Sequence, residues 1–155
     1  DEAMINLNVL ALTALTRLFL RDFVKRNSGK ILNIASTAAF VPGPIQAVYY
    51  ATKAFVLSFS QAIAEELHDT NITVTALCPG ATETEFGKVS GMDKTSMFKN
   101  AYSSKMVAED GYKGLIMGKL VIISGINLLQ KIVMVFVPFI PKKLLLKQIR
   151  IAQEV

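Results

Sequence analysis

Residues 30–36, with the sequence Lys-Ile-Leu-Asn-Ile-Ala-Ser, form a short apolar run that has the length of a buried strand. A loop of small residues follows this run, and the next segment predicts a long helix over about 48–67. The β-branched run 72–78 then predicts a second strand, which Pro79 and Gly80 end immediately. This strand–helix–strand unit predicts parallel strands joined by a helical crossover.

The flanking segments extend the same pattern on both sides. Apolar residues recur at spacings of three and four over residues 4–25, and residues 104–118 also predict a helix. A third strand is predicted over 119–124. The helix over 4–25 is apolar on most sides, so we expect its own sheet or a partner subunit to bury it. The alternation predicts an α/β protein with a parallel sheet buried on both faces.

Composition excludes several classes of protein. The 155 residues are 52% hydrophobic and carry a net charge of +5, which is typical of a single packed domain and not of a disordered chain. No basic stripe interleaves with aromatic residues, so we expect no nucleic-acid partner. The single cysteine, Cys78, and the single histidine, His68, favour neither a disulfide nor a metal site. We expect Cys78 to be a small core residue and the protein to be cytoplasmic.

Side chains suited to carbonyl chemistry lie where the predicted elements meet. Ser36 ends the first strand, and Tyr49 and Lys53 share one face at the start of the following helix. Ligands bind beyond the carboxyl ends of parallel strands, where Ser36 lies. A tyrosine phenol can donate a proton to a carbonyl oxygen if a nearby ammonium lowers its pKa. A serine hydroxyl can donate a second hydrogen bond to the same oxygen.

These residues resemble the serine and the Tyr-x-x-x-Lys motif of the short-chain dehydrogenase/reductase family. The spacing of 13 residues from Ser36 selects Tyr49 over Tyr50. The run Asn6-Leu7-Asn8-Val9 resembles the Asn-Val segment of the family's preceding helix, which makes Asn8 the candidate asparagine and leaves Asn6 as a rival. The resemblance implies that Tyr49 is the general acid/base and that Lys53 lowers its pKa and holds the cofactor ribose. It also implies that Ser36 steadies the substrate oxygen and that Asn8 supports the proton relay.

The segment after the second strand resembles the family's loop for the nicotinamide carboxamide. The resemblance implies cofactor contacts for Pro79, Gly80, Thr82 and Thr84, in addition to Tyr49 and Lys53, and no metal. Cys78 and Thr82 stand where the family often has asparagine and valine. The implied cofactor is NADP or NAD, with NADP favoured.

The resemblance covers about residues 4–124. It implies that residues 1–125 are the C-terminal part of a Rossmann-like doubly wound parallel sheet, with 126–155 as an apolar and basic helical extension of the same domain. The family's glycine-rich turn, Thr-Gly-x-x-x-Gly-x-Gly, is absent from the sequence. We therefore expect the N-terminal βαβ cofactor half to lie outside this chain, and the chain alone to be an inactive fragment.

The implied function is an NAD(P)-dependent oxidoreductase that interconverts a ketone and a secondary alcohol on an apolar, fatty-acyl or steroid-like substrate. The branch it resembles includes very-long-chain 3-oxoacyl-CoA reductases, 17β-hydroxysteroid dehydrogenases and bacterial reductases. The segment after the cofactor loop either lines an apolar substrate pocket or belongs to the core. The loop before the predicted helix over 48–67 would form the opposite wall of that pocket. The first set is Phe86, Met92, Met97 and Phe98, and the second is Phe40, Pro42, Pro44 and Ile45.

Two alternatives to an enzyme remain open. One is a non-catalytic module that forms a homodimer or homotetramer through the helices over 4–25 and 48–67. The other is a peripheral membrane protein, because residues 126–153 combine an apolar run with Lys142, Lys143 and Lys147. Polar residues interrupt the stretch 120–140, so we favour a packed or interfacial helix there over a transmembrane one.

Overall fold

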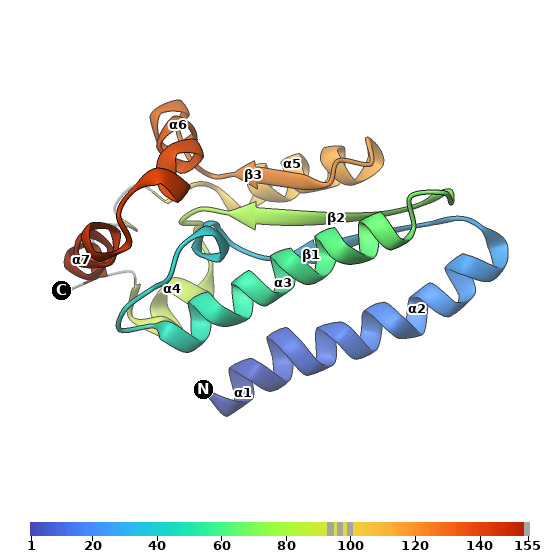
Figure 1. Ribbon diagram of the computed structural model, residues 1–155, viewed down its shortest axis with the longest axis horizontal. Helices are drawn as coiled ribbons and strands as arrows, with labels where there is room; N and C mark the ends of the chain where they lie inside the picture. Colours follow the sequence, from blue (N-terminus) through green and yellow to red (C-terminus); the bar gives the residue numbers. More distant parts are fainter. Residues whose placement is uncertain (93–94, 96–97, 99–100, 154–155) are drawn as a thin grey trace.

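The computed structural model describes residues 1–92, 95, 98 and 101–153. It contains a parallel sheet of three strands in the order β1-β2-β3, as Figure 1 shows. The strands are β1 (Gly29–Ile34), β2 (Ile72–Pro79) and β3 (Val121–Ser124). The expected parallel α/β sheet is therefore confirmed, and each strand lies within two residues of its predicted bounds.

The register brings the carboxyl ends of the strands to one edge of the sheet. Ile34 of β1 pairs with Leu77 of β2, and Pro79 at the end of β2 pairs with Ser124 of β3. The loops that leave these ends therefore start close together, which is where an open parallel sheet binds ligands.

Helices cover the two faces of the sheet in turn. Successive side chains of a strand point to opposite faces. Ala76 and Cys78 pack in one core cluster with Val56 of α3 (Ala47–Glu66). Between them, Leu77 points to the other face, where a Cβ on Gly111 of α5 (Ser104–Ile116) would lie 2.7 Å from its Cδ2 atom. Thus α3 and α5 enclose β2 between them.

The N-terminal helix is continuous but changes type along its length. A first turn, α1 (Glu2–Ile5), leads into a π-helical segment, η1 (Asn6–Ala11), and then into α2 (Leu12–Arg26). The helix ends at Asn27, whose φ of 47° is the left-handed conformation common after a helix C-terminus. By length and apolar composition this helix is long enough to cross a membrane. Its contacts with β1 and α3 nevertheless make it part of the folded domain.

The sheet of this chain covers little of this helix. We expect its own sheet or a partner subunit to bury it, and within this chain Thr16 is the one residue of α2 that is buried. Its exposed apolar side chains include Leu10, Leu15, Leu18, Phe19 and Val24. Within the described part of the chain, no element covers that face.

Three short helices complete the carboxyl edge. They are η2 (Thr37–Phe40) after β1, α4 (Glu85–Ser90) after β2, and α6 (Leu128–Phe136) after β3. Asn127 and Gln130 form a reciprocal capping box at the start of α6. A single turn, η5 (Val137–Phe139), leads past Pro141 into α7 (Lys142–Gln153). The expected C-terminal helical extension is thus two helices, because proline cannot continue a helix.

Candidate active site

All eight side chains predicted for catalysis or cofactor binding line a single cavity of about 730 Å³. It opens at the carboxyl edge of the sheet, between the start of α3, the end of β2 and α5. Its lining includes Asn8, Ser36, Tyr49, Lys53, Pro79, Gly80, Thr82 and Thr84.

Ser36 follows β1 by two residues and begins η2. Its Oγ atom accepts a hydrogen bond from the backbone N–H of Ala38 at 3.1 Å, which caps the turn. The same hydroxyl donates to the carbonyl oxygen of Pro79 at 3.5 Å. Ser36 therefore ties the end of β1 to the end of β2, and it lines the same cavity as Tyr49.

Tyr49 lies in the first turn of α3, half-buried between two aromatic rings. Its ring stacks on Phe86 with centroids 5.3 Å apart and meets Tyr50 edge-on at 5.8 Å. Burial raises the pKa of Tyr49 above its usual value, and the hydrogen bond with Ser36 partly opposes this increase. The phenol is therefore protonated at neutral pH.

The expected lowering of the Tyr49 pKa by Lys53 is wrong, because burial raises that pKa. The Nζ atom of Lys53 lies 6.0 Å from the centroid of the Tyr49 ring and donates to the carbonyl oxygen of Ile34 at 3.1 Å. Burial lowers the pKa of the Lys53 ammonium, and the Cys78 thiol partly opposes that change. For Tyr49, desolvation of the phenol is the largest influence on its pKa.

Asn8 joins the N-terminal helix to the catalytic helix. Its Nδ2 atom donates to the Oγ1 atom of Thr52 at 3.1 Å, and that hydroxyl donates to the backbone carbonyl of Tyr49 at 2.9 Å. Asn8 lies within the π-helical segment, whereas its rival Asn6 is exposed and lines no part of the cavity. The structure therefore favours Asn8 over Asn6 as the polar residue that faces the site.

The backbone of the loop after β2 is hydrogen-bonded to the end of β3. The N–H of Gly80 donates to the carbonyl of Ser124 at 2.8 Å, and a Cβ at Gly80 would lie 2.2 Å from the carbonyl oxygen of Gly125. Only glycine fits this close approach of two chain segments. The Oγ1 atom of Thr82 donates to the carbonyl of Gly80 at 2.9 Å.

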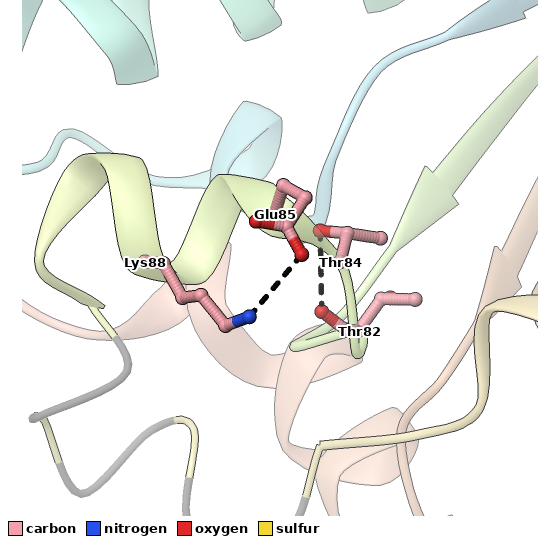
Figure 2. A network of polar contacts seen from close by, with 4 residues as sticks. All are labelled: Thr82, Thr84, Glu85 and Lys88. Atoms are coloured by element: carbon pink, nitrogen blue, oxygen red, sulfur yellow. Dashed lines mark hydrogen bonds and ion pairs between the residues drawn. The ribbon is translucent and has the colours of Figure 1, made fainter.

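Thr84 continues this loop into α4. Figure 2 shows its hydroxyl directed toward the carbonyl oxygen of Thr82, 3.5 Å away, beside the ion pair of Glu85 and Lys88. The Thr84 side chain is exposed and this hydrogen bond is long, so its hydroxyl is accessible to a ligand.

The predicted apolar walls separate into two cavities. Phe86, Met92 and Phe98 line the site cavity, whereas Met97 lies outside the described residues. The opposite wall is wrong: Phe40, Pro42 and Pro44 line a second, smaller cavity of about 560 Å³ between η2, α3 and Leu146 of α7. Tyr50 borders both cavities. Ile45 is 66% exposed and borders neither of them.

One wall of the site cavity was not predicted from the sequence. Ser104, Val107, Ala108 and Tyr112 of α5 line it. Their spacing of three or four residues places them on one helix face, and this is the signal that could have identified them. Nothing in the sequence shows, however, that this face meets Tyr49 across the sheet edge.

Comparison with known proteins agrees with this geometry. A family profile described as short chain dehydrogenase matches residues 2–95, which include Asn8, Ser36, Tyr49, Lys53 and the loop after β2. The chain belongs to the short-chain dehydrogenase family. The matched range includes all eight residues predicted for the site.

Individual relatives refine this assignment. Over 88 residues the chain is 43% identical to the very-long-chain 3-oxoacyl-CoA reductase of Rattus norvegicus, covering 57% of this chain and 28% of that protein. It is 38% identical to the 17-beta-hydroxysteroid dehydrogenase type 3 of Mus musculus, covering 57% of this chain and 29% of that protein.

A solved structure extends the similarity to nearly the whole chain. A short-chain dehydrogenase from Sphingobium yanoikuyae in complex with NADPH superposes with a TM-score of 0.74 at 30% identity. The match covers 97% of this chain and 57% of that one. The chain thus spans little more than half the length of this member of the family.

Proposed function

We propose that this chain forms the catalytic part of an NAD(P)-dependent oxidoreductase that interconverts a ketone and a secondary alcohol. The observation that carries the proposal is the convergence of Asn8, Ser36, Tyr49 and Lys53 on one cavity with the loop after β2. Residues so far apart in the sequence meet there because the strands are parallel and their ends coincide.

Tyr49 is the proton donor and acceptor in this proposal. Because burial keeps its phenol protonated at neutral pH, it can donate a proton to a carbonyl oxygen placed in the cavity. Ser36 lines the same cavity as Tyr49, so its hydroxyl can donate to the same oxygen and stabilise the charge that develops on it. Asn8, on the N-terminal helix, positions Tyr49 through Thr52 and supports proton transfer.

The residues around the cavity also fit one end of a nicotinamide cofactor. Lys53 would hold its ribose, while Pro79, Gly80, Thr82 and Thr84 would hold its carboxamide. When bound, the cofactor supplies or accepts the hydride. We favour NADP over NAD because the Sphingobium relative is in complex with NADPH. Titrations with NADPH and NADH distinguish the two.

The substrate proposed for this site is an apolar carbonyl compound or alcohol. Phe86, Met92 and Phe98 give the cavity an apolar wall beside Tyr49. The names of two relatives, a 3-oxoacyl-CoA reductase and a hydroxysteroid dehydrogenase, indicate fatty-acyl and steroid ketones. We therefore expect such ketones to be better substrates than small polar ones.

The activity test compares two neighbouring tyrosines in the natural polypeptide, with NADPH and an apolar ketone. Tyr49→Phe should lower turnover about 10²- to 10⁴-fold, because the proton donor is lost. Tyr50→Phe is the matched control, since its hydroxyl accepts a hydrogen bond from Gln153. Equal losses in the two variants, or full activity of Tyr49→Phe, would contradict the proposal.

A binding test applies to the 155-residue chain itself. Reduced nicotinamide mononucleotide carries the nicotinamide and its ribose without the adenosine half. We expect it to bind in saturation-transfer NMR and to lose this binding in Lys53→Met, but not in Lys105→Met on the exposed side of α5. With NADPH itself we expect weak binding and no turnover, because this chain carries no glycine-rich turn for the pyrophosphate.

A second candidate function is assembly of copies of the chain through α2 and α3. It is supported by the apolar side chains that the N-terminal helix exposes, among them Leu10 of η1 and Leu18 of α2. An exposed apolar surface of this kind commonly marks an interface. Light scattering should then detect a dimer or tetramer that Leu10→Glu with Leu18→Glu converts to a monomer. A wild-type chain that is monomeric at high concentration would reject this function.

A further inference from the structure

The helix α6 presents its apolar side to the surroundings. Six of its nine residues are large, apolar and exposed, and Leu128 at 74% is the most exposed of them. At 100° per residue these six side chains fall within roughly 160° of the helix circumference. With Phe139 of η5, which is 81% exposed, they form a surface that we call the C-terminal platform: Leu128, Leu129, Ile132, Val133, Val135, Phe136 and Phe139.

The platform lies beyond the carboxyl edge of the sheet. The chain enters α6 directly from β3, at the carboxyl edge of the sheet (Figure 1). Within the described residues, no element covers the exposed apolar side chains of α6.

Basic side chains accompany the platform. The helix α7 packs inward through Leu145 and Gln153, and it exposes Lys142, Lys143 and Lys147. Residues 126–153 contain four lysines, one arginine and no aspartate or glutamate. Figure 1 shows α6 and α7 together beyond the carboxyl edge, whereas α2 and α5 end at the opposite edge. The C-terminal region is therefore apolar and strongly positive at one end of the molecule.

We propose that the C-terminal platform binds the surface of a negatively charged lipid bilayer. An amphipathic helix with its apolar side outward enters the boundary between headgroups and acyl chains, and neighbouring lysines attract anionic lipids. A second copy of this chain complements the platform poorly, because it brings the same positive charges to the contact. The proposal is independent of the enzymatic activity, because it uses no residue of the site cavity.

Vesicle co-sedimentation of the 155-residue chain tests the proposal. The chain should bind phosphatidylcholine vesicles that contain one quarter phosphatidylserine, and bind pure phosphatidylcholine at least tenfold more weakly. A lysine near an anionic surface contributes about fivefold in affinity, so Lys142→Gln, Lys143→Gln and Lys147→Gln together should weaken binding roughly a hundredfold. Raising the salt to 1 M should weaken wild-type binding as well, because it shortens the screening length.

Two control variants test whether binding depends on charges and apolar side chains at the platform or on those anywhere in the chain. Lys25→Gln, Lys113→Gln and Lys119→Gln remove the same charge from exposed positions at the opposite edge of the sheet, and should retain most of the binding. Leu129→Ser with Phe136→Ser should weaken binding about tenfold, whereas Leu10→Ser with Leu18→Ser on the N-terminal helix should leave it unchanged.

Three outcomes would overturn the proposal. The first is equal binding to neutral and anionic vesicles, and the second is an equal loss in both triple-lysine variants. The third is a wild-type dimer in light scattering that Leu129→Ser with Phe136→Ser dissociates while vesicle binding is unchanged, since a second copy would then occupy the platform. Circular dichroism of each variant confirms that the exposed substitutions leave the fold intact.

Discussion

The helices α2 and α3 are both long and apolar, but the molecule buries them very differently. α3 lies along the sheet and buries Val56 and Ser60 completely, whereas α2 runs beside it toward β1 (Figure 1). Leu57 of α3 is 8% exposed and Leu18 of α2 is 56% exposed. An apolar sequence thus indicates that a helix needs a partner surface, and the tertiary arrangement decides whether this chain provides it.

The sharpest test of this difference is the same substitution made in both helices. Leu57→Ala should lower the free energy of unfolding by about 3 kcal/mol, because it leaves a cavity in the core under α3. Leu18→Ala should change it by less than about 0.5 kcal/mol, because its side chain is already in water. Urea denaturation of both variants measures the two values, and similar losses would mean that α2 is buried in solution.

The core beneath α3 also predicts that the free energy of unfolding depends on pH. Cys78 belongs to the core cluster beneath α3, and burial raises the pKa of its thiol from 9.0 to about 11. The unfolded chain therefore loses this proton first as the pH rises, so the contribution of Cys78 is fully present below pH 9 and is lost as the pH approaches 11. This shift of the thiol pKa lowers the free energy of unfolding by about 2–3 kcal/mol at high pH.

The substitution Cys78→Ala isolates this effect from the titration of tyrosines and lysines. Between pH 8 and pH 11 the wild type should lose more of its free energy of unfolding than the variant, by the amount given above. Parallel curves for the two proteins would show that the thiol is accessible to solvent in the folded state. A fast reaction of the native thiol with Ellman's reagent at pH 8 would indicate the same.

The smallest predicted effect concerns the hydrogen bond that joins the two helices. Asn8 donates to Thr52, so a double-mutant cycle with Asn8→Ala and Thr52→Val should give a coupling energy of about 1 kcal/mol. The cycle is measured by urea denaturation, with Asn6→Ala as the control because that side chain is exposed. A coupling energy near zero would mean that α2 and α3 are held together by packing alone.

The sequence predicted the parts of the site that depend on local pattern. Ser36, Tyr49 and Lys53 follow from strand ends and helix spacing, and Pro79 and Gly80 follow from the abrupt end of β2. The structure places these residues in one cavity, as the resemblance implies. The assignment of Tyr49 over Tyr50 depends on spacing alone and stays a prediction until the two variants are compared.

Other features required the three-dimensional arrangement. The sequence predicted that Phe40, Pro42 and Pro44 lie opposite the candidate site residues, but their loop turns to the other side of Tyr50 and lines a separate cavity. Gly43 permits this path, since a Cβ there would lie 2.1 Å from the Tyr50 ring. A tight passage of this kind depends on contacts between segments and leaves no periodic signal in the sequence.

The pKa of the Tyr49 phenol also depends on the folded structure. The spacing of Tyr49 and Lys53 correctly places both groups at one cavity, but spacing alone does not tell which effect controls the pKa of the phenol. In the folded chain, burial raises that pKa while Lys53 donates to Ile34. The balance depends on desolvation and on competing acceptors, which are properties of the assembled site.

By itself the sequence determined the elements and their parallel order and predicted which groups react, because hydrophobic period, turn residues and motif spacing are local properties of the chain. The tertiary structure alone decided which apolar faces are covered, which cavity each wall borders and in which direction burial shifts the pKa of Tyr49. These outcomes depend on distances between segments remote in the sequence, and burial and desolvation are set by those distances.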